Sequence, residues 1–508
     1  MLNHLSNLQV AIASGVGQYP SKAPFDPPEQ FPELPFRTRP VDPANGVYPM
    51  VRESLKLLKL DIARFGTSAW NPLGEIISPG DRVLIKPNFV LHRNAGHGPL
   101  DAVVTHASVL RPIADYVLRA LQGRGTLIIG DAPQMNCDMA TLFAHNGMDG
   151  LVDYLTEACA AQGVQFAVKD FRQEQTYYLA GIVWSRKPLP RGAHGTIPVT
   201  LGPESFMDSI DQSLLYGADY DRSQTTQAHT GHRHEYRIAS EVLQSDVIIS
   251  VPKLKVHSKV GTTLNIKNMV GINTDKNHLA HYRIGPRAKG GDEFSNPRWY
   301  DRVDRRLSDY LMGRHWEWGK YPFLGWKFFL KAWKYIQPPP KDAFGFGNWR
   351  GNDTAWRMAL DLNRVLLTSD ALGTLQPTPI RKYFSIIDGI VGGQGDGPLH
   401  PDAFPSKVVL AGFNPLAVDW VATNLMGLDP SRIPMYVNGA GQMREWVPEF
   451  GAAQLKIASN TPAFERALDN DRTIFRFATA PGWRGSVERY KLDSAATPPV
   501  PEPDPILQ

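Results

Sequence analysis

Asp81-Arg-Val-Leu-Ile-Lys-Pro-Asn-Phe-Val90 is an apolar run with polar residues at both ends, and Thr126-Leu-Ile-Ile129 is a second run of the same kind. Between them, Thr105-His-Ala-Ser108 opens a stretch whose apolar residues recur at helical spacing until Gly123. Short apolar runs bounded by turn residues are typical of buried strands, and the helical spacing is typical of an amphipathic helix. The stretch therefore predicts a strand–helix–strand unit, the repeat from which parallel sheets are built.

The same alternation continues along the chain. Its pattern predicts helices over 151–161, 356–367 and 417–426, and strands over 164–168, 246–251, 384–388 and 408–411. Helices that alternate with short strands rich in β-branched residues indicate a parallel sheet buried on both faces. The predicted fold class is α/β, with a mostly parallel sheet, helices on both faces, and two α/β lobes with the site between them.

Composition divides the chain into five segments. Prolines and polar residues predict an irregular arm over residues 1–45 and a loose tail over 496–508. Between them we expect an α/β lobe over 46–290, an insertion over 291–345 and a second α/β portion over 346–495.

The amino-acid composition, the net charge and the number of cysteines exclude several classes of protein. With 42% hydrophobic residues, the 508-residue chain is globular, and 54 basic against 50 acidic residues are too evenly balanced for general nucleic-acid binding. Two cysteines, Cys137 and Cys159, are too few for a disulfide framework or for an iron–sulfur cluster held by this chain alone. We see no secretory signal and no apolar run of about 18 residues. The expected location is the cytoplasm, with peripheral contact to the inner face of the cell membrane as a candidate.

A cationic strand follows the apolar run 246–251. If the chain is extended there, Lys253, Lys255, His257 and Lys259 share one face, because residues two apart in a strand point the same way. Such a face indicates a bound anion. The alternative is a solvated sheet edge, which lysines protect from pairing with other strands.

The next segment, Gly261-Thr-Thr-Leu-Asn-Ile-Lys-Asn268, combines small residues, hydroxyls, amides and a lysine. This mixture lets backbone N–H groups cradle an oxyanion, and a desolvated Lys267 could clamp charge or act as a nucleophile. Alternatively, Asn265 and Asn268 cap turns and Lys267 pairs with a carboxylate. The predicted ligand-binding residues of this segment are Gly261, Thr262, Thr263, Asn265 and Asn268, beside Lys267.

Further polar residues follow predicted strands, where open parallel sheets bind ligands. Lys86 and Asn88 follow one strand, and Asp131 follows the next. The glycine-rich stretch 388–396 adds Asp388, Gly393, Gly395 and Asp396 as candidate ligand contacts. We expect His257, Lys267, Asp131 and Asp388 to carry the chemistry, because an acid–base site needs carboxylates or imidazoles beside its cations.

His278 and His281 are three residues apart. On a helix they would face one way and could hold a divalent metal, although a pair at this spacing can equally be structural.

Residues 315–336 are the strongest compositional outlier. From about Phe323 to Ile336 the sequence can form a helix with a narrow stripe of lysines (Lys327, Lys331 and Lys334) among aromatic and aliphatic residues. Such a helix suits the surface of an anionic membrane. The alternative is a helix that packs against the body or against a second copy of the chain in a homo-oligomer.

Taken together, these motifs resemble the DUF362 family over about residues 80 to 430. The resemblance rests on Ile85-Lys-Pro-Asn88, Gly130-Asp-Ala132, the ordered series from Lys255 to Gly271, and Asn414-Pro-Leu-Ala-Val-Asp419. The family resemblance implies no settled function. Some members resemble ferredoxin-type iron–sulfur proteins, but this chain lacks the cysteines.

A second resemblance is to the lactate racemase family. Asp246-Val-Ile248, His257, Gly261 and Lys267 are similar in order and spacing to its motif. This resemblance implies that His257 is an acid–base residue, that Lys267 anchors a nickel pincer nucleotide, and that His278 or His281 binds nickel. The chain departs from that family at Gly130-Asp-Ala132, where a Gly-Thr-His is expected, and at Thr262-Thr263.

The leading hypothesis is an enzyme that acts on a phosphorylated or carboxylated small molecule, such as a sugar or glycolipid intermediate, with an isomerase, epimerase or transferase favoured. The competing hypotheses are a non-catalytic ligand-binding or membrane-associated assembly protein, and a racemase or isomerase that depends on a metal or on the nickel cofactor.

Overall fold

The computed structural model describes residues 3–34, 40–191, 195–217, 222–313, 315–443, 450–469 and 472–492. The predicted loose tail, 496–508, lies outside these ranges.

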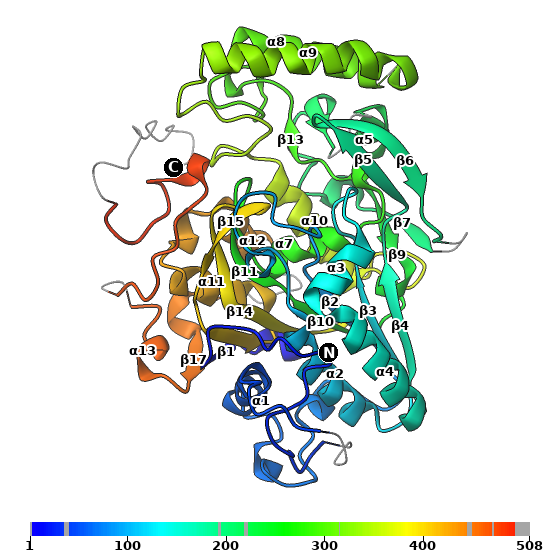
Figure 1. Ribbon diagram of the computed structural model, residues 1–508, viewed down its shortest axis with the longest axis vertical. Coiled ribbons are helices and arrows are strands. Elements are labelled where there is room, and N and C mark those ends of the chain that lie inside the picture. The colour runs from blue at the N-terminus through cyan, green and yellow to red at the C-terminus, as the bar shows by residue number, and fades with distance from the viewer. Residues whose placement is uncertain are drawn as a thin grey trace.

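One large sheet runs through the molecule (Figure 1). Along its main path the strands are β17 (Lys456–Ser459), β1 (Gln9–Ser14), β16 (Val408–Gly412), β14 (Lys382–Asp396), β10 (Val247–Val251), β2 (Arg82–Pro87), β3 (Thr126–Asp131) and β4 (Gln165–Asp170). Neighbours from β14 to β4 are parallel, whereas β16 is antiparallel to both β14 and β1. The prediction of a mostly parallel α/β sheet is confirmed.

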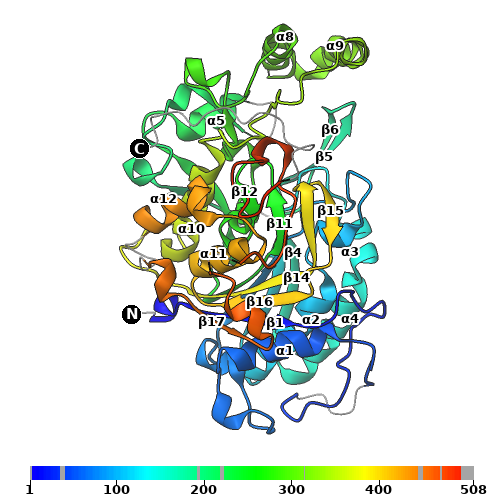
Figure 2. The same ribbon diagram turned by 90° about the vertical axis from the view of Figure 1, so that its left-hand side faces the viewer.

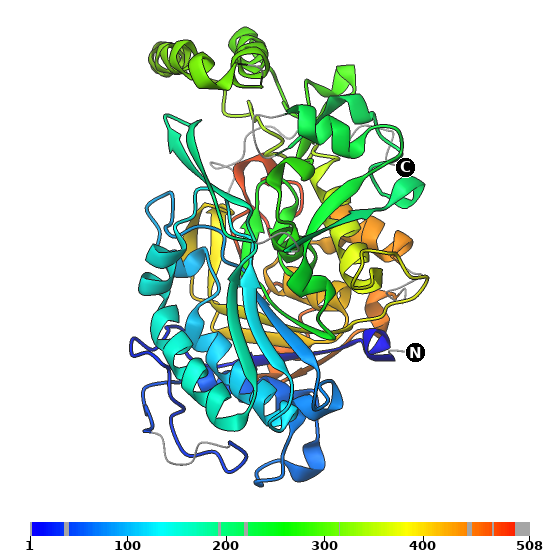
Figure 3. The ribbon, with the colours of Figure 1, turned by 90° about the vertical axis from the view of Figure 1, so that its right-hand side faces the viewer.

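Helices cover both faces of this sheet (Figure 3). Val83 and Ile85 of β2 belong to one core, with helices α1 (Val47–Leu57), α2 (Ala107–Leu121) and α4 (Met148–Gln162). Leu84, which points the other way, belongs to a second core with α10 (Ala355–Thr368) and α11 (Pro415–Leu425). The two cores follow from the alternation of side chains along each strand.

The two predicted α/β portions contribute strands to the same sheet, because β10 from the first pairs with β14 from the second. The prediction of an irregular arm over 1–45 is wrong for Gln9–Ser14, which forms the buried strand β1 between β16 and β17.

β14 is longer than the sequence predicts. It continues from Lys382 to Asp396, well beyond the predicted strand 384–388 and through the glycine-rich stretch that follows it. There it pairs with β15 (His400–Phe404) and β11 (Lys253–His257), and β11 pairs in turn with β12 (Gly261–Thr263). The short helix α7 (Asn265–Asn268) follows directly. β11, β12 and β15 therefore extend the sheet beyond the carboxyl ends of the parallel strands. They place the cationic segment that begins at Lys253 at that edge of the sheet.

Two long helices lie across one end of the molecule (Figures 1 and 2). They are α8 (Trp299–Leu307) and α9 (Trp316–Ile336), from the segment predicted as an insertion. A hairpin of β5 (Glu174–Leu179) and β6 (Ile182–Pro188) reaches up to them. The remaining larger elements are α3 (Met139–Asn146), α5 (Arg222–His229), α12 (Pro434–Gln442), β7 (Thr196–Thr200) and β9 (Glu235–Ala239).

Candidate functional site

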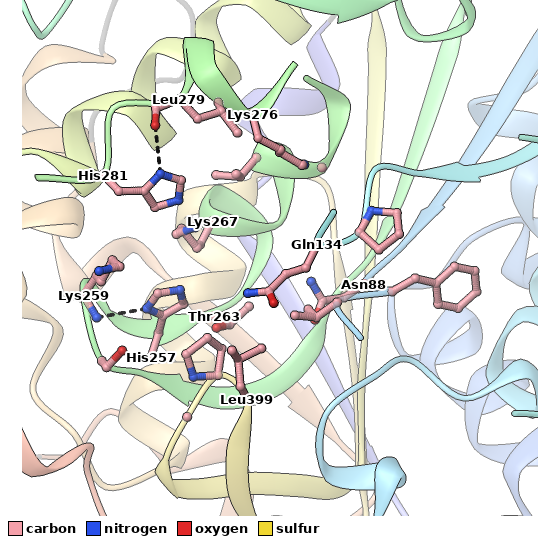
Figure 4. A pocket seen from close by; sticks show the side chains of 18 of the residues that line it. Asn88, Gln134, His257, Lys259, Thr263, Lys267, Lys276, Leu279, His281 and Leu399 are labelled. Atoms are coloured by element: carbon pink, nitrogen blue, oxygen red, sulfur yellow. Dashed lines mark hydrogen bonds between the residues drawn. The ribbon is translucent and has the colours of Figure 1, made fainter. Parts of the chain in front are cut away.

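A cavity of about 700 Å³ lies above the carboxyl ends of β2 and β3, where open parallel sheets bind ligands. This volume is within the range of small-molecule sites. Figure 4 shows side chains from several elements around it. Its main polar lining residues are Lys86, Asn88, Asp131, Gln134, His257, Lys259, Thr263, Lys267, Asn268, Lys276, His281 and Asp396.

A buried ion pair forms part of the cavity wall. The Lys86 ammonium donates to Asp131 Oδ1 at 2.7 Å, to Asn268 Oδ1 at 2.9 Å and to the Pro87 carbonyl. Asp131 also accepts from the backbone N–H groups of Phe89 and Ala132. Burial lowers the pKa of Lys86 and raises that of Asp131. Because other protein groups already supply the hydrogen-bond partners of Lys86 and Asp131, we assign this ion pair a structural role, that of holding the cavity wall in place.

His257, at the end of β11, is held as one tautomer. Its Nδ1 accepts the backbone N–H of Lys259 at 3.0 Å, so in the neutral ring the proton is on Nε2. Burial, and then the neighbouring Lys267, lower the pKa of His257 well below 6.5. The ring is therefore neutral and can offer an N–H donor to the cavity.

His281 is held as the opposite tautomer. Its Nδ1 lies 2.9 Å from the Leu279 carbonyl, which can only accept, so Nδ1 carries the proton and Nε2 keeps its lone pair. Burial and Lys267 lower the pKa of this histidine well below 6.5 as well. Figure 4 shows both rings on the same side of the cavity, with Lys267 between them. These two rings thus offer the cavity one imidazole donor and one imidazole acceptor.

Three lysines add positive charge to the same cavity. Burial, and then the charges of Lys276, Lys259 and Lys86, lower the pKa of Lys267 to about 7. The pKa of Lys259 and that of Lys276 are each lowered to about 8, mainly by burial. Lys276 donates to the Ala132 carbonyl and Lys259 to that of Phe346, whereas Lys267 has no hydrogen-bond or ion-pair partner among the described residues. The lysine charges indicate that the cavity accepts an anion.

Two buried polar atoms of the lining also lack a partner within the described ranges. They are Asn88 Oδ1 and Thr263 Oγ1, whose residues are 6% and 3% exposed. A buried polar group without a hydrogen bond costs free energy, so we expect a water molecule or a ligand to form hydrogen bonds with these two atoms.

Three residues predicted for the site lie outside the cavity lining. Lys253 is fully buried and donates to Asp388 Oδ2 at 3.1 Å, and Tyr19 donates to Asp388 Oδ1 at 2.6 Å. Lys255 donates to the carbonyl of Val103. The prediction of a four-cation ligand face is therefore wrong, since only His257 and Lys259 of that strand reach the cavity, and Asp388 is not available for proton transfer. The solvated-edge alternative is also wrong, because all of β11 is buried.

Five more predicted contacts serve the fold instead. Asn265 donates to Asp419 and accepts from Tyr383 and Ser385. The backbone of β12 is paired with β11, so it is not free to form the predicted oxyanion cradle. Of its residues only Thr263 lines the cavity. Outside the lining are Gly261, Thr262, Asn265, Gly393 and Gly395.

The predicted histidine metal pair does not form. The segment is one short turn of 3-10 helix, and His278 lies near the Glu235 carbonyl and Asp275, away from the cavity that His281 lines. Across the described part of the chain there is no group of three or more His, Cys, Asp or Glu side chains placed to hold a metal ion.

The family model described as "Domain of unknown function (DUF362)" matches residues 83–180 and 207–424, more than half of the chain. The chain belongs to the DUF362 family. The matched residues contain all three histidines of the cavity lining, His257, His281 and His400, and its four lysines. The resemblance to lactate racemases stays a prediction.

Among curated proteins, this DUF362 chain is similar to a thylakoid-associated protein of Synechocystis sp., at 23% identity over 364 residues, which are 71% of this chain and 68% of that protein. Among solved structures, a Thermotoga maritima protein aligns with a TM-score of 0.30 and 11% identity. That alignment covers 74% of this chain and 58% of the other. Within the described residues, no helix has the length and apolar character needed to cross a membrane.

Sequence reasoning missed several lining residues of this DUF362 protein. Gln134 reaches the cavity from the loop after β3 and Lys276 from the 3-10 turn Lys276–His278. Phe346 and Asn348 follow directly after the predicted insertion 291–345. Gln134 follows the strand-end motif Gly130-Asp-Ala-Pro133, so its place after β3 was a usable signal. Lys276 offered no such signal, because it lies far along the chain from any predicted strand end.

Proposed function

We propose that this DUF362 protein is an enzyme that binds an anionic small molecule, phosphorylated or carboxylated, and moves a proton on it. The observation that carries the proposal is the pair of neutral histidines in opposite tautomers beside the unpartnered Lys267. Lys267, with Lys259 and Lys276, would bind the anion. His281 Nε2 would take a proton from the substrate, and His257 Nε2–H would donate one.

A bound anion would also raise the pKa values of His257 and His281. Its negative charge offsets the lysines that hold both imidazole pKa values down, so those pKa values rise toward the range in which acid–base catalysis works best. Removal and return of a proton at one centre is isomerase or epimerase chemistry, which is the reaction class we favour. Asp131 and Lys86 then act through position, not by touching the substrate.

The test is a screen of phosphorylated and carboxylated metabolites for a rise in melting temperature, followed by incubation of each binder with the protein in D₂O. We expect mass spectrometry to find solvent deuterium at carbon in at least one binder. His281→Gln should slow this exchange about a hundredfold or more with little change in affinity. Lys267→Met should lose the affinity itself.

Exposed His97 and Lys22 provide matched controls, and His97→Gln and Lys22→Met should behave as the unaltered protein does. Ligands that bind without any exchange would contradict catalysis and support the competing class, a non-catalytic binding protein.

We propose the cytoplasm as the location, with peripheral contact to a membrane. The two cysteines, Cys137 and Cys159, are free and buried, as suits a reducing compartment. The name of the thylakoid-associated relative supports the membrane contact.

A further inference from the structure

Helix α9 presents an apolar stripe to solvent. Trp318, Tyr321, Phe328 and Tyr335 are 55%, 60%, 57% and 89% exposed, and Ile336 is 72% exposed. Trp318, Tyr321, Phe328 and Tyr335 follow one another at steps of three or seven residues, and Ile336 lies eight residues after Phe328, so all five side chains share one face of the helix. Tyr321 meets the ring of Trp184 in β6 edge-on, and the high exposed fractions show that the rest of this face is open to solvent. Scattered single apolar residues are ordinary on a protein surface, but a continuous aromatic stripe marks an interaction site.

The opposite face of α9 is already in use. Phe323 packs with Ile182, Leu311 and Met312, and Leu330 is buried. Lys327, which the sequence placed on a lysine stripe, instead forms an ion pair with Asp304 of α8 at 2.7 Å. The body of the protein therefore covers one side of the helix and leaves most of the aromatic side exposed.

The charges on this end of the molecule are complementary to an anionic surface. In α8 and α9, both described in full, the exposed basic residues are Arg302, Arg306, Lys331 and Lys334, and Glu317 is the exposed acidic residue. Aromatic rings that carry a polar N–H or O–H, next to lysines, suit the boundary between lipid head groups and acyl chains. A purely apolar protein partner would leave these lysines and phenols without partners.

The stripe is connected to the cavity through the β5–β6 hairpin. Tyr178 and Gly181 of this hairpin line the cavity, and the adjacent Ile182 packs on Phe323 of α9. Trp316 of α9 donates its indole N–H to the Val183 carbonyl at 3.1 Å. Figure 2 shows the hairpin rising from the body to the two helices. One element thus forms both the cavity rim and the support of the stripe.

We propose that the exposed stripe of α9 docks this protein on an anionic lipid bilayer, with α9 in the membrane interface and the cavity rim held beside it. The docking does not depend on the reaction in the cavity. Such docking would explain why the aromatic stripe, the basic residues and the cavity rim all lie at the same end of the molecule.

Vesicle flotation tests the proposal. The full chain should float with vesicles of phosphatidylcholine and phosphatidylglycerol in equal parts, and this binding should weaken in high salt or without phosphatidylglycerol. A triple variant, Phe328→Ser/Tyr335→Ser/Ile336→Ser, should float at least tenfold less. A matched triple variant at other exposed apolar positions, Ile62→Ser/Leu372→Ser/Val437→Ser, should float normally.

Failure of the unaltered protein to float, or equal flotation of the α9 variant, would overturn the docking. If light scattering shows that the α9 variant converts a dimer to a monomer and no form floats, the stripe is instead an interface with a second copy. Sulfate binding separates this proposal from the cavity function. A folded α9 variant should bind sulfate normally, and Lys267→Met should still float.

Discussion

His257 and His281 offer complementary atoms to one cavity, because the backbone N–H of Lys259 fixes the first ring and the Leu279 carbonyl fixes the second. Neither contact is to a side chain, so the tautomers depend on the path of the main chain. The arrangement supplies a proton donor and a proton acceptor while both rings are neutral.

We therefore predict that both rings stay neutral well below pH 6.5, with the proton on Nε2 in His257 and on Nδ1 in His281. Their lowered pKa values follow from burial and the adjacent lysines. Nitrogen-15 NMR of histidine-labelled protein, assigned with the two His→Gln variants, would report each tautomer directly. Protonation of either ring near pH 6.5, the ordinary value for a histidine, would contradict this prediction.

Sulfate affinity should fall as the pH rises. Lys267, with its pKa lowered to about 7, is a cation below that pH and neutral above it, and Lys259 and Lys276 follow with values of about 8. Since sulfate itself does not titrate in this range, the loss of affinity reports the protein. Bound sulfate stabilises the protonated lysines, so binding should take up protons, which calorimetry in two buffers of different ionisation enthalpy measures.

In Lys267→Met the step near pH 7 should disappear and the residual affinity should be weak. Lys22→Met is the control, because Lys22 is exposed and distant in sequence from the lining residues. An affinity that rises with pH in the unaltered protein would contradict the assignment of these lysines to the anion.

The fold was predictable where its signals are local. The run Asp81–Val90 and the helix after Thr105 match β2 and α2 closely, because strands buried on both faces carry their pattern in a few consecutive residues. β1 was not recognised, because its six residues precede the proline-rich part of the arm that begins at Pro20 and its pairing partner, β16, is about four hundred residues away. Strand pairing over such separations leaves little trace in a short window of sequence.

The site was predictable only in outline. Periodicity placed Lys253, Lys255 and His257 on one strand, but which of them reaches the cavity depends on distant residues. Lys253 forms an ion pair with Asp388, 135 positions away, and Lys255 donates a hydrogen bond to the Val103 carbonyl. Such pairings are tertiary contacts, so a strand pattern could indicate a cationic site without separating its ligand contacts from its internal ion pairs.

The ion pair of Lys86 and Asp131 should show strong coupling. Asp131→Asn leaves a buried ammonium without its counter-charge, and we expect it to lower the free energy of unfolding by about 3–5 kcal/mol. The double variant Lys86→Met/Asp131→Asn should recover part of that loss, because no charge is left buried. Urea unfolding of both single variants and the double variant measures the coupling.

The exposed pair of Arg466 and Asp469 is the control for this cycle. Its side chains are 51% and 36% exposed, so Asp469→Asn should change the free energy of unfolding by less than about 1 kcal/mol. Equal effects at the two pairs would show that burial does not strengthen the Lys86 contact.

Gly271 should not tolerate even a methyl group, because a Cβ atom there would lie 2.0 Å from Asp131 Oδ1 and 2.7 Å from Lys86 Nζ. The Gly271 carbonyl also accepts the N–H of Ala132 at 2.8 Å, so the backbone cannot move away without losing that bond. We expect Gly271→Ala to cost about 2–3 kcal/mol in urea unfolding and to weaken sulfate binding, because the ion pair in the cavity wall must shift. Gly441→Ala in α12 is the control, since no atom lies within 4 Å of its added Cβ, and it should be neutral or stabilise the helix by about 0.5 kcal/mol. If Gly271→Ala were as harmless as the control, the close approach of this glycine to Lys86 and Asp131 would not exist in solution.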